Sequence, residues 1–292
     1  MPCNADQVHL AWRRDDIRSR SGFLIIRRYH RLSAQFKHLR PYSAMQTIIL
    51  LGGKGTRLSQ MFPNQPKALA PVAGQPFLQR QLSWLAGAGI TDIHLAAGHL
   101  AECITTWVDG TATAAPSEIG HGILNIGYSG LNITFSKESS PLGTAGGLKF
   151  AEQHIRSNPF LVLNGDSLLP QLDFGAFRQA HEQAHPLASI AVAKIEGTGR
   201  YGTIEFDNQN SILAFREKAK HAQGWVNAGV YLVETKAMAL IDPGKALSLE
   251  TDIFPRLAAQ GHLRAFPVPP PLLDMGTPKG LAAMEDYFAR RG

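Results

Sequence analysis

From Met45 onward, short apolar runs alternate with segments of helical periodicity, and this alternation limits the possible folds more than any other feature. The runs Gln46–Leu51 and Pro159–Asn164 are almost continuously apolar, which is typical of strands buried on both faces. Phe77–Ala88 instead carries apolar residues along one helical stripe. The alternation predicts a mostly parallel sheet flanked by helices. Strands are expected at 46–51, 91–97, 133–136, 159–164 and 187–195, and helices at 77–88, 100–108, 144–154 (capped by Thr144) and 174–184.

The pattern changes after residue 200. Two short runs, Thr203–Phe206 and Ile212–Phe215, flank a polar turn and predict an antiparallel hairpin. Further strands are expected at 226–233 and 263–268, and helices at 248–260 and 278–290. The predicted fold is therefore α/β and Rossmann-like, with a small antiparallel hairpin addition. No hexapeptide pattern of a β-helix tail follows, so the chain is expected to end with this domain.

The net charge of +6 lies entirely in the N-terminal arm. Nine of the 29 Lys and Arg residues and three of the 23 Asp and Glu residues fall in 1–44, which leaves 20 of each sign elsewhere. A basic arm can contact nucleic acid, but the organised pattern begins only at Met45. We therefore interpret 1–44 as a basic extension and 45–292 as the functional domain. The chain has no apolar run of ~20 residues and no secretory h-region, so a cytoplasmic protein without membrane or nucleic-acid partners is expected.

The segment LLGGKGTRLSQMFPNQPKAL, residues 50–69, follows the first expected strand directly. Its glycines allow close backbone approach to a ligand, and successive N–H groups in such a turn bind anions. Arg57 and Lys67 add fixed positive charge. The segment does not fit a P-loop, and Leu58 stands where a dinucleotide fingerprint needs its third glycine. The pattern predicts a phosphate site at the carboxyl end of the strand.

Two motifs carry a family resemblance: GGKGTRL at 52–58 and PKALAPVAGQPFL at 66–78. With them the chain resembles the sugar-nucleotide pyrophosphorylases, which join an NTP to a sugar 1-phosphate and release pyrophosphate. Further matching pieces are AAGHL at 96–100, PLGTAGGL at 141–148, LVLNGDSL at 161–168, FREK at 215–218, NAGVYL at 227–232 and DMGTP at 274–278. The resemblance runs from about Met45 to the C-terminus.

The resemblance implies roles for individual residues. Arg57, Lys67 and Asp166 would be catalytic, and Asp166 would bind Mg²⁺ together with Asp274. Taken alone, these two acids would be a turn former and a helix cap. The implied nucleotide-binding residues are Leu51, Gly52, Gly53, Gly55, Thr56, Arg57, Lys67, Gly98, Gly143 and Thr144. The implied sugar-phosphate residues are Glu217, Lys218, Asn227 and Gly229.

Several subfamilies share these motifs. The combination looks most similar to D-glycero-D-manno-heptose 1-phosphate guanylyltransferases, with GTP as the nucleotide. Mannose 1-phosphate guanylyltransferases are the second alternative, and uridylyl or thymidylyl transferases acting on other hexose phosphates are the third. A catalytically silent regulatory subunit and a nicotinamide-dependent oxidoreductase are rivals from other classes. The oligomeric state is left open.

Overall fold

The computed structural model describes residues 45–53, 55, 58, 61–111, 122–124, 130–196, 198, 201–216 and 223–291. The strands are β1 (Thr47–Leu51), β2 (Pro71–Val72), β3 (Gln75–Pro76), β4 (Asp92–Ala97), β5 (Gly122–Leu124), β6 (Leu131–Lys137), β7 (Phe160–Asn164), β8 (Ser167–Leu168), β9 (Ala188–Glu196), β10 (Thr203–Phe206), β11 (Ile212–Arg216), β12 (Gln223–Val233), β13 (Leu263–Val268) and β14 (Leu273–Asp274). The α-helices are α3 (Phe77–Gly87), α4 (Ala101–Thr111), α5 (Gly143–Phe150), α6 (Phe174–Ala184), α7 (Phe254–Ala259) and α8 (Pro278–Ala289). Shorter helical turns are η4 (Lys67–Leu69), η5 (Glu152–His154), η7 (Thr235–Leu240) and the π-helical η8 (Leu249–Ile253).

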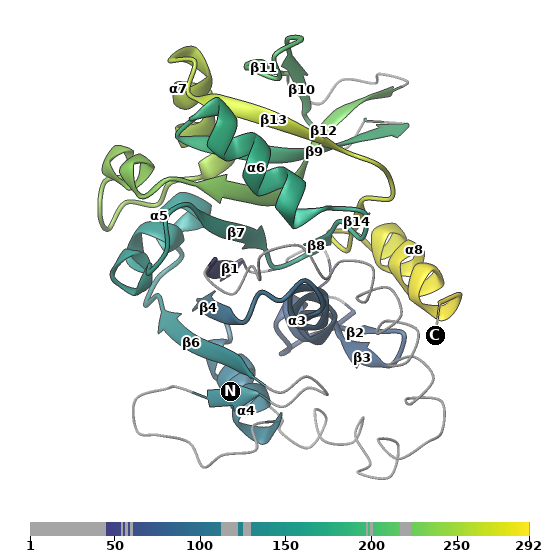
Figure 1. Ribbon diagram of the computed structural model, residues 1–292. Coiled ribbons are helices and arrows are strands. Elements are labelled where there is room, and N and C mark those ends of the chain that lie inside the picture. Colours follow the sequence, from purple (N-terminus) through teal and green to yellow (C-terminus); the bar gives the residue numbers. More distant parts are fainter. Residues whose placement is uncertain are drawn as a thin grey trace.

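The centre of the fold is a parallel sheet in the order β7-β1-β4-β6. Adjacent residues of β1 point to opposite faces, and Ile48 and Ile49 are fully buried in two different core clusters. One face is covered by α3, α4 and α6, and the other by α5 and α7. Figure 1 shows α3 and α5 on opposite sides of β1. The continuous apolar strands thus form the doubly covered sheet that the sequence predicts.

Beyond β7 the sheet becomes mainly antiparallel, although β9 and β13 pair parallel. Strand β12 pairs antiparallel with both β7 and β9, and the β10–β11 hairpin joins its other end. The hairpin is confirmed, but the antiparallel section is larger than the small addition expected. Strand β5 pairs antiparallel with β6 on the other side of the parallel sheet. Parallel and antiparallel describe a strand relative to the strand it pairs with. The apolar residues of one strand therefore do not predict which of the two pairings it forms.

The expected helix 248–260 is divided in two. The π-helical turn η8 comes first, and α7 then begins with Pro255 in its first turn. Proline has no N–H group and cannot continue a regular helix, but it is well suited to a helix start. The expected helix 144–154 similarly ends at Phe150 and continues as the separate turn η5.

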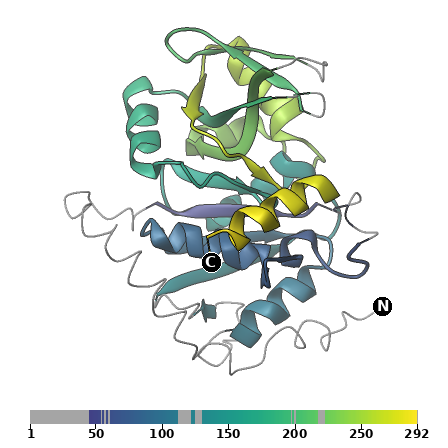
Figure 2. The same cartoon turned by 90° about the vertical axis from the view of Figure 1, so that its right-hand side faces the viewer.

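The C-terminal helix α8 follows β14 and contacts α3. Its start is capped by the Thr277 hydroxyl, which accepts from the Gly280 N–H, and Pro278 occupies the first turn. Arg80 of α3 lies over the Phe288 ring of α8, 4.4 Å from its centroid. Figure 2 shows α8 lying across this side of the molecule. Among the helices in the described ranges, none combines the length and apolar character needed to cross a bilayer.

Candidate active site

A cavity of about 330 Å³ opens where β1, β4 and β7 end. The glycine-rich turn after β1 forms one wall, and the start of α5 forms another. The carboxyl edge of a parallel sheet is where open α/β folds bind ligands. The structure brings together here eight of the predicted residues: Leu51, Gly52, Gly53, Gly55, Lys67, Gly143, Thr144 and Asp166.

The glycine-rich turn folds back against Lys67. Gly55 has a φ of +58°, and a Cβ at this position would lie 3.1 Å from the Cβ of Lys67. A side chain would therefore meet both backbone strain and a close contact. The Leu58 N–H donates to the Gly55 carbonyl over 2.9 Å and closes the turn. The predicted residues Thr56 and Arg57 lie outside the described residues.

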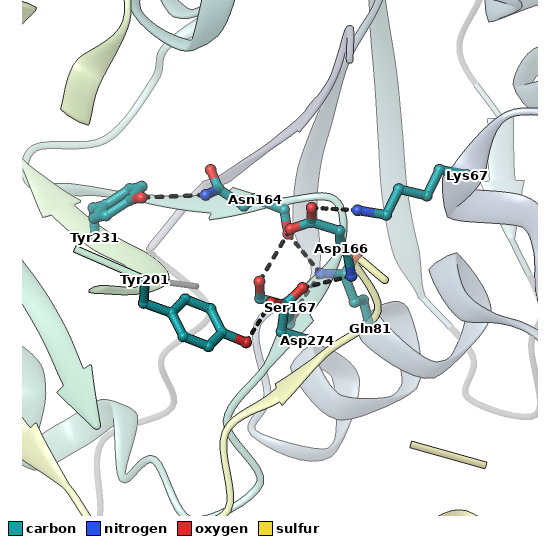
Figure 3. A network of polar contacts seen from close by, with 9 residues as sticks. Lys67, Gln81, Asn164, Asp166, Ser167, Tyr201, Tyr231 and Asp274 are labelled. Atoms are coloured by element: carbon teal, nitrogen blue, oxygen red, sulfur yellow. Dashed lines mark hydrogen bonds and ion pairs between the residues drawn. The ribbon is translucent and has the colours of Figure 1, made fainter. Parts of the chain in front are cut away.

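Lys67 and Asp166 form an ion pair at the base of the cavity. The Lys67 Nζ lies 2.6 Å from an Asp166 carboxylate oxygen, and their side chains are 16% and 34% exposed. Gln81 of α3 brackets the turn that carries Asp166, because its Nε2 donates to the Asn164 and Ser167 carbonyls at 2.9 Å each. Figure 3 shows this arrangement. The acid is thus held by the end of β7, by a helix and by a cation.

Asp274 lies beside Asp166 through strand pairing. Strand β14 pairs with β8 in a register that places Asp274 opposite Ser167, and the Met275 N–H donates to the Asp166 carbonyl over 3.0 Å. The Tyr201 hydroxyl donates to Asp274 over 2.6 Å (Figure 3). In the part of the chain that the structure describes, no group of three or more His, Cys, Asp or Glu forms a metal cluster. Two neighbouring carboxylates nevertheless fit Mg²⁺, which takes one or two carboxylates plus phosphate and water oxygens.

Glu138 is a cavity residue that the sequence analysis missed. It follows β6 directly, is buried, and its Oε1 lies 2.3 Å from where a Cβ on either Gly52 or Gly98 would be. Among the described residues, only the Leu142 N–H donates to its carboxylate, over 3.3 Å. Burial raises the pKa of Glu138, against the lowering effect of this bond. The available signal was its position directly after a parallel strand, which Asp166 shares.

Gly98 lies next to Glu138, and Thr144 is not the helix cap that the sequence predicts. Gly98 lies against the Glu138 carboxylate, and its lack of a side chain leaves room for that carboxylate. Thr144 does not cap α5; its hydroxyl donates to Glu250 over 2.7 Å and accepts from the Leu249 N–H over 2.8 Å. In the first turn of α5, the N–H groups of Ala145 and Gly146 instead donate to the Leu247 carbonyl. The approach of the 247–250 segment from another part of the chain therefore replaces a local cap.

The predicted sugar-side residues of β12 lie next to the cavity wall. The Gly229 N–H donates to Asn227 Oδ1 over 2.8 Å, and Gly229 has a φ of +73°. A Cβ on Gly229 would lie 3.1 Å from the Cβ of Asn164, which lines the cavity. Glu217 and Lys218 lie outside the described residues.

Residues 46–290 match the family described as nucleotidyl transferase. The chain belongs to the nucleotidyl transferase family. The family predicted from the sequence motifs is thereby confirmed, and so is its fold.

Curated relatives of this nucleotidyl transferase include mannose-1-phosphate guanyltransferases of yeasts. Mannose-1-phosphate guanyltransferase 2 of Candida glabrata is 35% identical over 244 residues, which cover 82% of this chain and 63% of the relative. The Saccharomyces cerevisiae protein is 35% identical over 242 residues, 80% of this chain and 62% of the relative. The chain thus spans a little less than two thirds of the length of these relatives.

Solved structures share the fold. HddC from Yersinia pseudotuberculosis, solved in complex with GMP-PN, superimposes with a TM-score of 0.70 at 26% identity, over 84% of this chain and 99% of HddC. The inositol-1-phosphate CTP transferase from T. maritima gives a TM-score of 0.65 at 16% identity, over 85% of this chain and 96% of that one. The second likeness concerns the fold alone.

Proposed function

We propose that this protein transfers a guanylyl group from GTP to a sugar 1-phosphate of manno configuration and releases pyrophosphate. Family membership and the yeast mannose-1-phosphate guanyltransferase relatives support the reaction class. D-mannose 1-phosphate and D-glycero-D-manno-heptose 1-phosphate share the manno ring. The relatives favour mannose, whereas the sequence motifs most resemble the heptose enzymes.

The observation that carries the choice of base is the Glu138 carboxylate in the cavity wall. Guanine presents its N1–H and its N2 amino group side by side on one edge, and a carboxylate accepts from both. Uracil and thymine place a carbonyl oxygen on each side of a single N–H, so lone pairs would face lone pairs. Adenine and cytosine present a ring acceptor beside their amino group. Glu138 is thus complementary to guanine, and HddC was solved with a guanine nucleotide analogue.

On the phosphate side, the glycine-rich turn and Lys67 supply the positive potential. Backbone N–H groups of Gly52, Gly53 and Gly55 would hold the triphosphate, and Lys67 would turn from Asp166 to the α-phosphate as the nucleotide enters. The sugar phosphate oxygen then attacks the α-phosphorus in line, and pyrophosphate leaves. Asp166 and Asp274 would hold Mg²⁺, which supplies positive charge at the reacting phosphate. Arg57 is proposed to assist at the leaving group.

On the sugar side, Asn227 is proposed to bind a sugar hydroxyl, and Gly229 lets the substrate approach the backbone. Lys218 would bind the phosphate of the sugar 1-phosphate, and Glu217 a second hydroxyl. The roles of Lys218 and Glu217 rest on the resemblance of the FREK motif to the family, whereas Asn227 and Gly229 lie on β12 next to the cavity wall.

The experiment that tests the proposed function is pyrophosphate release with Mg²⁺. The nucleotides are GTP, UTP, dTTP, CTP and ATP, each combined with mannose, D-glycero-D-manno-heptose and glucose 1-phosphates. Release that requires GTP and one of the two manno sugars supports the proposal and decides between them. Release with another nucleotide overturns the base assignment. Nucleotide binding without release in any combination favours a silent regulatory subunit.

Glu138→Gln is expected to lower kcat/KM for GTP about a hundredfold, since one charge-assisted acceptor becomes a donor, at a cost of ~2–3 kcal/mol. The fall for UTP should be much smaller, because a glutamine amide can pair with an N–H and a neighbouring carbonyl. Steady-state kinetics with both nucleotides checks this. The matched control is Glu285→Gln, the same chemical change on an exposed position of α8. An equal loss for GTP and UTP would contradict the role of Glu138 in reading the base.

We propose that residues 1–44 are dispensable for this activity. The family match begins at residue 46, and the charge of the remainder balances to zero. A chain beginning at Met45 is expected to retain kcat and KM within about twofold and to stay soluble. An inactive or aggregated truncated protein would show instead that the arm contributes to the fold or the site.

A further inference from the structure

The hydroxyl of Tyr231 is the centre of a polar network beside the cavity. Tyr231 is fully buried on β12. Its oxygen lies 3.0 Å from Asn227 Nδ2, 3.2 Å from Asn164 Nδ2 and 3.0 Å from Glu250 Oε1. Figure 3 shows its link to Asn164. Three polar groups from three different elements therefore meet at a single hydroxyl.

The direction of each hydrogen bond follows from the chemistry of the partners. A carboxylate can only accept, so the one proton of the Tyr231 hydroxyl goes to Glu250. The two lone pairs of Tyr231 then accept from the amides of Asn227 and Asn164. Burial and the nearby Glu250 raise the pKa of Tyr231 well above its usual value, so the hydroxyl keeps the proton it donates.

The orientation of Asn227 is fixed from both ends. Its Oδ1 accepts from the Gly229 N–H, a backbone group whose direction does not depend on the assignment of the amide. Its Nδ2 donates one hydrogen to Tyr231. One amide hydrogen of Asn227 remains to be donated to a ligand. Without the Tyr231 hydroxyl, the Nδ2 group would lose its acceptor, and the side chain could rotate.

The network also reaches the nucleotide side of the cavity. The second carboxylate oxygen of Glu250 accepts from Thr144 over 2.7 Å and from Ser248 over 2.8 Å. Thr144 lines the cavity wall at the start of α5. Glu250 thus joins the wall of the nucleotide site to the tyrosine that holds Asn227.

We propose that Tyr231 and Glu250 are a positioning pair that orients Asn227 to donate a hydrogen bond to a hydroxyl of the sugar substrate. The inference rests on the proposed function, since it assigns the sugar as the ligand of Asn227. Neither residue of the pair touches the reacting atoms. They act through Asn227, and the affinity for the sugar phosphate is the quantity they control.

The test is Tyr231→Phe, which removes one oxygen and keeps the ring. With GTP saturating, the KM for the sugar 1-phosphate is expected to rise about tenfold, equivalent to ~1.4 kcal/mol, while the KM for GTP stays within about twofold. Glu250→Gln should raise the sugar KM as well, because its amide can donate to Tyr231 and reverse the direction of the bonds. The control is Phe254→Leu. Its ring lies 4.9 Å from that of Tyr231, so it removes packing and leaves the network intact.

Three outcomes would overturn the proposal: an unchanged sugar KM in Tyr231→Phe, equal rises in both KM values, or an equal rise in Phe254→Leu. A wild-type protein that transfers to no sugar phosphate would refute the proposed function separately. In that case the crystal structure of Tyr231→Phe still decides the positioning claim. The Asn227 amide is expected to rotate away from its wild-type orientation. An unchanged orientation would refute the claim that Tyr231 orients Asn227.

Discussion

Asp166→Asn is expected to lower the turnover about a thousandfold, because the variant loses the carboxylate that would hold Mg²⁺ at the reacting phosphate. Metal charge at such a phosphate stabilises the transition state by several kcal/mol, and each 1.4 kcal/mol corresponds to about tenfold in rate. The asparagine is nearly isosteric and keeps the turn that Gln81 brackets. The measurement is pyrophosphate release at saturating GTP and sugar phosphate over a range of Mg²⁺ concentrations.

The control for this variant is Asp286→Asn, the same change on the exposed side of α8. Asp166→Asn also removes the ion pair with Lys67, but that pair is partly exposed and its loss should cost stability little. The melting temperature should therefore stay near that of the wild type. A turnover close to wild type at all Mg²⁺ concentrations would refute the metal role of Asp166.

The second large effect concerns stability in acid. His94 is fully buried on β4, between the hydroxyls of Thr134 and Ser136 at 2.8 and 2.9 Å. Burial, with smaller contributions from His154 and Arg156, lowers the pKa of His94 from 6.5 to about 3. The unfolded chain therefore takes up a proton at a pH where the folded protein does not, so the stability present above pH 6.5 is lost as the pH falls toward 3. The full difference corresponds to roughly 5 kcal/mol.

Urea unfolding at a series of pH values between 7 and 4 measures this loss. His94→Gln removes the titrating group and should flatten the dependence, whatever its effect on stability at pH 7. Part of the dependence should remain in the variant, because burial also lowers the pKa of His181. The same slope in wild type and variant would contradict the role of His94. Ser136 lines the cavity, so His94 also helps to fix that wall.

Much of the fold is predictable because its signals are local. The helix over 174–184 and the strands over 203–206 and 263–268 have the predicted bounds. Their signals are turn residues and periodicity, which act within a few residues of the chain. The two-residue strands β2, β3, β8 and β14 were not predicted, because pairs of this length carry no periodicity.

The candidate site, like the fold, contains residues that local motifs indicate and residues that only the structure reveals. The motifs around Gly52, Lys67 and Asp166 were visible in the sequence, and all three residues line one cavity. Glu138, Tyr231 and Glu250 were missed. A single acid or a tyrosine within an apolar strand resembles an ordinary core or surface residue until its neighbours are known.

The sequence by itself determined the family, the parallel core of the sheet and the glycine-rich turn with its cations, since these depend on contiguous residues and their order. Only the tertiary structure decided that Glu138 lies against Gly52 and Gly98, that Thr144 bonds to Glu250, and that Tyr231 joins Asn164 to Asn227. Thr144 and Glu250 are 106 residues apart in the chain, and Asn164 and Tyr231 are 67 residues apart. Such contacts form only once the sheet and its crossovers have brought the strand ends together, so no local pattern encodes them.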